Sequence, residues 1–334
     1  MLKMSHQFIG NEQLIEKLDT SYKKKTLSNS LIFSGPKGIG KKTLAFFFIK
    51  NIFYFLSNKN LINHHINLIY NNTHPNIKYL RKDFDKKTNK IKTSISIEQI
   101  RNLENFFYQS SLYNLPKFIL IDSADDLNKN SANALLKILE EPKDNTFFIL
   151  ITHQLSNLLP TLRSRCVKFY IKKPNFNQFN QILNFKDKIN NQDDVLFLYN
   201  LCNGSPGAAL KFISENFNQL FLLIIKILDI NKPISKEVIQ LTNLVINYSN
   251  DQYKTFLLLI RFILMTIIKI NIGINLKKEY YSKFYESIEN IATKHENSNI
   301  LKILEFLNNN ENDLFLYNLD KKVFSLNIFT SLNN

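Results

Sequence analysis

Residues 34–43, SGPKGIGKKT, have the residue types and spacing of a loop that binds phosphate. The segment directly follows an apolar run and opens into residues 44–48, LAFFF, so it would join a strand to a helix. Glycines let the backbone N–H groups face an anion, and a following lysine can reach the outer phosphates. An ordinary glycine-rich turn is the alternative interpretation. The candidate phosphate ligands are Gly35, Gly38, Gly40 and Lys41.

The residue after Lys41 departs from this pattern. Phosphate-binding loops carry Ser or Thr at that position, and the hydroxyl group binds Mg²⁺. Here the position holds Lys42, whose ammonium group would repel a divalent cation. Thr43 brings a hydroxyl one residue late, rotated by roughly 100° around a helix. We therefore keep Thr43 as a candidate nucleotide contact, and expect the loop to bind phosphate without a correctly placed Mg²⁺.

A second segment with chemical potential is residues 118–128, FILIDSADDLN. An acidic residue at the tip of a buried strand holds the metal in P-loop ATPases, so Asp122 is a candidate nucleotide-site residue. Active ATPases of this arrangement place a glutamate next, but the sequence has Ser123, whose hydroxyl is no base at neutral pH. Asp125 and Asp126 are expected to cap or solvate the following helix. A strand that simply ends in an acidic turn is the alternative.

A third segment, residues 158–166, LLPTLRSRC, places Arg163 and Arg165 in a predicted loop before a strand. Two arginines at this spacing are, taken alone, most often surface charge.

Four apolar runs and a weaker fifth predict the sheet that must position these segments. Continuous apolar runs of this length indicate strands buried on both faces. Helical patterns at residues 99–107 and 131–139 lie between them, and strands that alternate with helices indicate an α/β parallel sheet. The predicted strands are residues 31–33, 118–121, 147–151, 167–170 and, more weakly, 76–80.

The pattern changes after Lys172-Lys173-Pro174, beyond which only helical segments are predicted. Residues 50–95 are polar and are expected to carry loops. The sequence thus predicts an α/β domain over residues 1–172, a small helical domain over 173–215 and a larger helical domain over 216–334.

Composition limits the partners and the compartment. The net charge of +15 is typical of a nucleic-acid partner, although AT-rich codon usage would also produce it. Cys166 and Cys202 form no motif, which favours a reducing compartment. The most apolar stretch, residues 256–270, is shorter than the ~20 residues that span a bilayer. We expect a soluble cytoplasmic protein without membrane contact.

Together these segments resemble the bacterial DNA polymerase III delta-prime family of clamp-loader AAA+ proteins. The resemblance runs in order through most of the first 210 residues, and the last 120 carry no matching motif. The helix SANALLKILEEP and the SRC of residues 164–166 are its most specific parts. The other matching motifs are HQFIGNEQ (6–13), FSGPKGIGKKTLA (33–45), ISIEQIRNL (95–103), IDSADDLNKN (121–130), and NGSPGAAL (203–210).

The resemblance implies an α/β AAA+ P-loop domain with a parallel sheet, a small helical lid domain and an all-α collar domain. It implies a hetero-pentamer with gamma/tau-type and delta-type subunits, which acts on the sliding clamp and primed DNA. Arg165 would be an arginine finger that reaches the ATP site of a neighbouring subunit. No cofactor would be required, and any ATP or ADP binding would be weak.

Departures from active relatives point to a chain without its own ATPase activity. Their sensor arginine would fall at Pro206, Gly207 or Ala208, none of which is a cation. Some relatives bind zinc through four cysteines, which this chain lacks. We expect no metal site, and interpret His64, His65 and His74 as solvated loop residues.

Three other functions remain open. An active gamma/tau-type clamp-loader ATPase would need a hydroxyl residue after Lys41 and a glutamate after Asp122. A stand-alone AAA+ DNA-processing ATPase would need the same residues but no SRC motif. A purely structural ring subunit would tolerate replacement of Arg165.

Overall fold

The computed structural model describes residues 8–57, 59–85, 90–187, 192–230, 232, 234–274 and 284–332. The chain forms two compact units, Met1–Gln181 and Ile182–Asn334. The boundary lies inside helix α8 (Phe176–Asp187). The division into three domains at residues 172 and 215 stays a prediction.

The first unit is built on a five-stranded parallel sheet. The three inner strands are almost entirely buried, as expected when helices cover both faces. All five predicted runs form strands, including the weaker one. The order across the sheet is β2 (Ile77–Leu80), β5 (Lys117–Asp122), β6 (Thr146–Thr152), β1 (Ser30–Ser34) and β7 (Val167–Tyr170).

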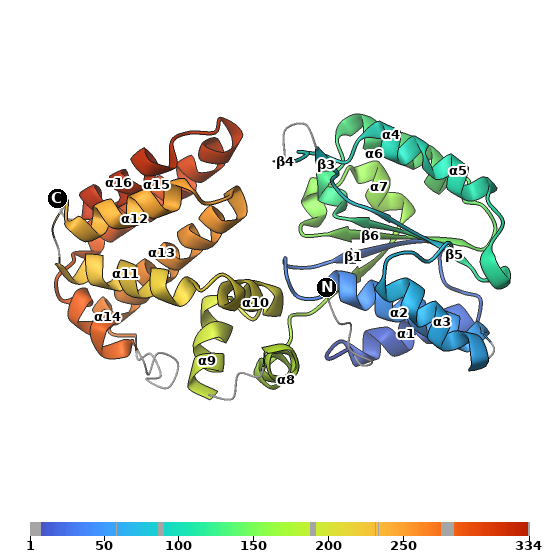
Figure 1. Ribbon diagram of the computed structural model, residues 1–334, viewed down its shortest axis with the longest axis horizontal. Coiled ribbons are helices and arrows are strands. Elements are labelled where there is room, and N and C mark those ends of the chain that lie inside the picture. The colour runs from blue at the N-terminus through green and yellow to red at the C-terminus, as the bar shows by residue number, and fades with distance from the viewer. Residues whose placement is uncertain are drawn as a thin grey trace. The chain divides into compact units, whose positions relative to one another are not determined.

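Helices cover the sheet in two layers, each with its own apolar cluster (Figure 1). One face is covered by α1 (Glu12–Lys23), α2 (Lys41–Leu56) and α3 (Lys59–Tyr70). The other face is covered by α4 (Ile97–Arg101), α5 (Leu103–Tyr108), α6 (Lys129–Glu140) and α7 (Pro160–Arg165).

Two local predictions were wrong. Strand β7 is largely exposed, with Val167 46% and Tyr170 63% accessible, because it is an edge strand with a single neighbour. The helix expected over 99–107 is two helices separated at Asn102. The segment 50–95 carries loops at residues 71–76 and 81–83, as expected, and also contributes the end of α2, α3, β2 and the antiparallel pair β3 (Phe84–Asp85) and β4 (Lys90–Ile91).

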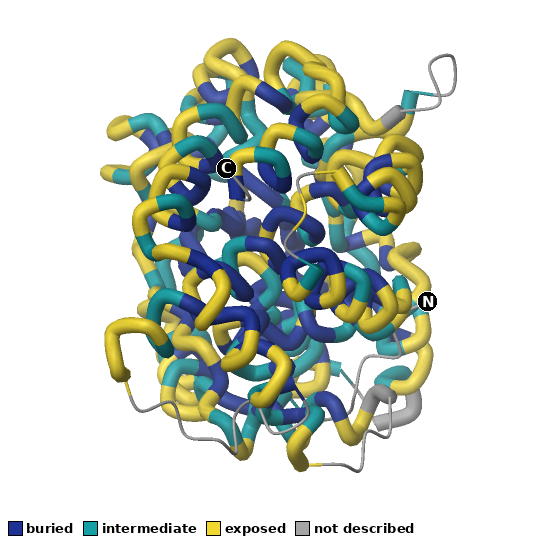
Figure 2. The backbone as a smooth tube through the Cα atoms, turned by 90° about the vertical axis from the view of Figure 1, so that its left-hand side faces the viewer, coloured by how far each residue is buried: buried dark blue, intermediate teal, exposed yellow. Residues whose placement is uncertain are grey.

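The second unit is helical throughout its described residues, as predicted. Its helices show buried and exposed stretches in alternation, the pattern of amphipathic packing (Figure 2). Phe197 of α9 contacts the rings of Phe221, Phe262 and Phe284, so the early helices share a core with the later ones. The helices are α9 (Gln192–Leu201), α10 (Pro206–Ser214), α11 (Phe217–Ile230), α12 (Lys236–Ile246), α13 (Asn250–Asn271), α14 (Tyr285–Ala292), α15 (Asn297–Leu316) and α16 (Lys321–Leu332).

Among the described residues, no single helix is long and apolar enough to cross a membrane. Helices α10 and α11, bent by 85° where they meet, reach that length and composition only as a pair.

Candidate nucleotide site

The predicted phosphate loop joins β1 to α2, the connection that such a site requires. Gly35 has φ +148°, and a Cβ there would lie 2.7 Å from the carbonyl oxygen of Ile171. Gly40, at φ +96°, is the residue before the first turn of α2. Any side chain at Gly35 would displace the backbone, so the loop depends on glycine there.

Lys41 is held inside this loop rather than extended from it. Its side chain is buried, and Nζ donates to the carbonyl oxygens of Gly35 at 2.5 Å and Pro36 at 2.6 Å. Burial lowers the pKa of Lys41 to about 8, although the nearby carboxylates of Asp122 and Asp125 act against this shift. A phosphate ligand would therefore have to draw the ammonium group away from two carbonyl partners.

Lys42, Tyr79 and Asp122 form a contact that sequence reasoning missed. The hydroxyl of Tyr79 donates to Asp122 Oδ2 at 2.8 Å, and the ammonium of Lys42 lies 4.2 Å from the centre of the Tyr79 ring. Burial and the adjacent carboxylate raise the pKa of Tyr79, which stays a hydrogen-bond donor at neutral pH. Tyr79 lies on β2, whose pairing with β5 brings it beside Asp122, and that pairing is not readable from either segment alone.

Ser123 occupies the position after Asp122 and is nearly buried. Its Oγ donates to Asp126 Oδ2 at 3.1 Å, and the other oxygen of Asp126 pairs with Lys82 at 3.0 Å. The position therefore presents a hydroxyl whose neighbouring carboxylate is already paired with a cation. A hydroxyl in this state is a poor substitute for a glutamate that accepts a proton from water.

The expectation that Asp125 and Asp126 cap the following helix was wrong. Asp125 accepts from Thr152 Oγ1 at 2.9 Å and from the backbone N–H of His153 at 2.7 Å, so it ties the end of β5 to the end of β6. Asn128 caps α6 instead, accepting from the N–H of Ser131 at 2.8 Å.

Arg165 is the last residue of helix α7, so the loop predicted around it was wrong. Its Nη2 pairs with Glu140 Oε1 at 2.6 Å and its Nη1 donates to Thr161 O at 3.1 Å. Its side chain remains 37% exposed. The structure thus brings the glycine loop, Lys41 and Asp122 together, whereas the hydrogen bonds of Arg165 go to α6 and its own helix. Thr43 lies in the first turn of α2 and is half-buried.

The description of the histidines as solvated loop residues was wrong for two of them. His65 on α3 and His74 are 1% and 3% exposed, and His65 Nδ1 lies 3.0 Å from His74 Nε2. His64 is exposed. Within the described ranges, no three His, Cys, Asp or Glu side chains cluster closely enough to hold a metal ion.

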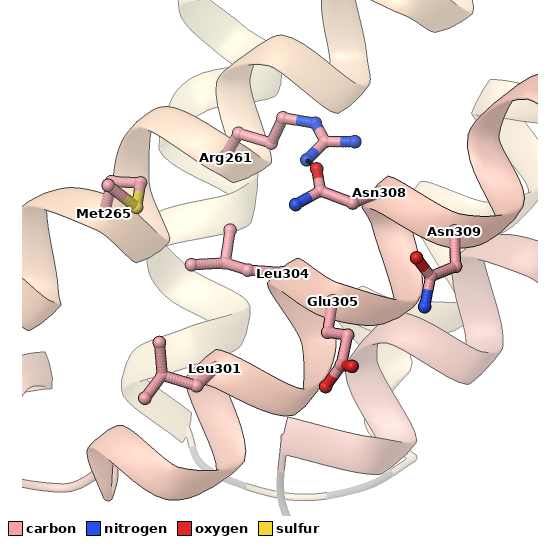
Figure 3. Close-up of a pocket in the computed structure, with 7 residues that line it drawn as sticks. All are labelled: Arg261, Met265, Leu301, Leu304, Glu305, Asn308 and Asn309. Atoms are coloured by element: carbon pink, nitrogen blue, oxygen red, sulfur yellow. Dashed lines mark hydrogen bonds between the residues drawn. The ribbon is translucent and has the colours of Figure 1, made fainter.

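A hollow of about 540 Å³ lies on the second unit between α13 and α15 (Figure 3). The guanidinium of Arg261 at its rim donates to Asn308 Oδ1 at 2.5 Å and pairs with Glu311 at 2.7 Å, so it is already engaged. Met265 and Leu301 are half-exposed beside it. Glu305 is the only carboxylate among the residues that line the hollow, and it is exposed.

The parallel sheet, the glycine loop between β1 and α2, and the acidic end of β5 define a P-loop protein of the AAA+ class. Residues 10–175 match the family model described as "DNA polymerase III, delta subunit". Over this domain the chain is similar to the DNA polymerase III delta-prime family.

Three relatives illustrate the similarity. The delta-prime subunit of Pseudomonas aeruginosa is 47% identical over 74 residues, 22% of this chain and 23% of that protein. The delta-prime subunit of Bacillus subtilis is 33% identical over 156 residues, 46% of this chain and 45% of that protein. The gamma subunit of Buchnera aphidicola from Schizaphis graminum is 28% identical over 238 residues, 71% of this chain and 61% of that protein. The matches to the two delta-prime subunits span less than half the length of each.

Proposed function

We propose that this chain is the delta-prime-type subunit of a DNA polymerase III clamp loader. In this role it assembles with gamma/tau-type and delta-type subunits in a hetero-pentamer and supports loading of the sliding clamp onto primed DNA. It supplies Arg165 to the ATP site of a neighbour and hydrolyses no ATP itself. The observation that carries the proposal is an intact AAA+ frame whose own site lacks the metal-binding hydroxyl and the catalytic glutamate.

The residues of the candidate nucleotide site favour binding of a nucleotide without its hydrolysis. Lys42 replaces the hydroxyl that would bind Mg²⁺, and Ser123 replaces the glutamate that would orient water. Gly35, Gly38, Gly40 and Lys41 retain the phosphate cradle. We therefore infer weak ATP or ADP binding that does not depend on Mg²⁺.

The purified chain is expected to hydrolyse ATP far more slowly than about 1 s⁻¹, the lower end of ordinary enzyme turnover. The reason is the absence of both groups that act on the metal and on the attacking water. Phosphate release from the isolated chain, with and without Mg²⁺, measures this. Turnover near 1 s⁻¹ would show that the chain is an active ATPase.

A second candidate, an active gamma-type subunit, draws support from the length of the alignment to a gamma-type relative. Lys42 and Ser123 stand against it. The two candidates differ in one experiment: co-purification with gamma/tau-type and delta-type subunits, followed by ATPase measurement with and without clamp and primed DNA. A delta-prime-type chain joins the complex and remains inactive when isolated, whereas a gamma-type chain hydrolyses ATP.

The second unit supports a role in assembly. Its helices leave apolar side chains such as Leu258, Met265 and Leu301 more than 40% exposed, and such surfaces are typical of protein contacts. The chain carries no recognised phosphate-binding motif in these residues. We infer that this unit provides the collar contacts of the pentamer.

A chain that ends after Asp187 is expected to fold but not to enter the complex. The first unit keeps both apolar clusters that cover its sheet. A cut near residue 216 is less suitable, because it would remove the partners of Phe197. Co-purification with tagged partner subunits measures assembly, and the full-length chain is the control. Equal recovery of both chains would contradict the collar assignment.

A further inference from the structure

The carboxylate of Asp122 is where a nucleotide-bound metal ion would be held in an active P-loop protein. In this chain one of its oxygens, Oδ2, accepts the hydroxyl hydrogen of Tyr79 at 2.8 Å. The Tyr79 ring is fixed in turn, since it packs against Phe46 with ring centres 5.9 Å apart. The phenol thus occupies one of the acceptor positions that the carboxylate would offer to a metal ion or its bound water.

Lys42 adds a positive charge at the same place. Its ammonium lies 4.2 Å from the centre of the Tyr79 ring and 5.9 Å from that of Phe46. Burial lowers the pKa of Lys42, while the carboxylate of Asp122 favours its charged form. A cation over an aromatic face is stabilised by the ring, which keeps the lysine where it repels a second cation.

The residues present therefore do not fit a Mg²⁺ ion. Position 42 holds a lysine in place of the hydroxyl residue that would bind the metal. The carboxylate of Asp122 already accepts a hydrogen bond from the phenol of Tyr79. The glycine loop and Lys41 fit a phosphate group, because the backbone geometry and the ammonium are both retained.

We propose that Tyr79 and Lys42 together block the metal position, so that the site takes a nucleoside phosphate without its divalent cation. Tyr79 acts through the Asp122 carboxylate, and Lys42 supplies in place of the metal a fixed positive charge beside the phosphate loop. This inference rests on the proposed function in one respect, namely that the nucleotide site is degenerate. It goes further by naming Tyr79 and Lys42 as the residues that exclude the metal ion from that site.

The test is carried out on the full-length chain with ADP and Mn²⁺ as probes. Free Mn²⁺ is measured by electron paramagnetic resonance in the presence of ADP, and ADP affinity by calorimetry without metal. Tyr79→Phe keeps the ring contact with Phe46 and removes the hydroxyl. Lys42→Thr restores a hydroxyl and removes the charge. Each variant alone should raise Mn²⁺ affinity by about tenfold, the factor expected for one charge-assisted hydrogen bond or one nearby charge.

Two control variants match these changes elsewhere in the same unit. Tyr70→Phe removes a buried hydroxyl that has no hydrogen-bond partner among the described atoms. Lys50→Thr removes a lysine 4.5 Å from the centre of the Phe47 ring on the same helix. Both controls should bind Mn²⁺ and ADP as the unaltered chain does. Circular dichroism checks that all four variants remain folded.

A gain in Mn²⁺ affinity in both Tyr79→Phe and Lys42→Thr, with none in the controls, supports the block. If either variant gains nothing, its residue has no part in excluding the metal and the proposal falls. Failure of ADP to bind the unaltered chain also overturns it, since the loop would then hold no phosphate. None of these results depends on the assembled complex, so the proposed function is judged separately by assembly and by stimulated ATPase activity.

Discussion

Replacement of Arg165 by alanine is expected to leave folding and assembly intact but to remove most of the stimulated ATPase activity at one site of the complex. An arginine finger stabilises the charge on the transferred phosphoryl group and is worth about 10³–10⁵ in rate where it acts alone. The measured loss should be smaller, because other sites of the ring keep their own fingers. ATPase activity of the assembled complex with clamp and primed DNA is the measurement.

Stability should change little in this variant. The ion pair of Arg165 with Glu140 joins two exposed side chains, and such pairs contribute about 0–1 kcal/mol. Arg165→Lys should also lose activity, since a lysine keeps the charge but not the planar fork of the guanidinium.

Arg101→Ala is a matched control, because Arg101 is an exposed arginine at the end of another helix of the same unit. Arg163→Ala should also matter less for activity, but Arg163 Nε is buried without a hydrogen-bond partner among the described atoms, so its truncation changes packing as well. If the assembled Arg165→Ala complex kept full clamp-stimulated ATPase and clamp-loading rates, Arg165 would not be an arginine finger. The chain would then have only a structural role in the ring.

Acid is expected to destabilise the first unit through the buried pair of His65 and His74. The backbone N–H of Asn76 donates to His74 Nδ1, which makes His74 Nε2 the protonated nitrogen. His74 Nε2 then donates to His65 Nδ1, so both rings are neutral. Protonation of either ring would place two N–H groups face to face inside an apolar site that includes Phe53, whose ring centre lies 4.7 Å from that of His74.

Burial and the neighbouring histidines lower the pKa of His74 from 6.5 to about 4. The unfolded chain therefore binds more protons between these two values, and the free energy of unfolding falls as the pH falls. The difference between these two pKa values corresponds to about 3 kcal/mol, lost progressively between pH 6.5 and pH 4. Urea unfolding at several pH values measures this dependence.

His74→Asn isolates the contribution, because the asparagine oxygen can still accept from the Asn76 N–H while the titrating ring is gone. Its stability at pH 7 should be lower, but its dependence on pH between 6.5 and 4 should be weaker than that of the unaltered chain. His64→Phe removes the exposed histidine next to His65 on α3 and tests the smaller contribution of that neighbour to the pKa of His74. Equal pH dependence in the unaltered chain and His74→Asn would mean that this pair does not titrate as described.

Much of the frame was predictable from the sequence because its determinants are local. Strands β1, β5 and β6 are continuous apolar runs, and burial on both faces of a parallel sheet produces such runs directly. The loop between β1 and α2 was equally clear from its glycines. At Gly35 the backbone of Ile171 lies so close that only glycine, which has no Cβ, fits. The replacements at positions 42 and 123 can also be read from the sequence, because each position has a fixed spacing within its motif.

The tertiary structure decided what these residues touch. Tyr79 and Asp122 are 43 positions apart and meet only because β2 pairs with β5. His65 and His74 looked like solvated loop residues in a polar segment, yet both are buried where α3 packs beside the sheet. Whether a strand lies at the edge or the centre of a sheet depends on the strand order. Which partner a polar group finds depends on how distant segments pack together. Composition and periodicity describe one segment at a time, so they carry no information about such pairs.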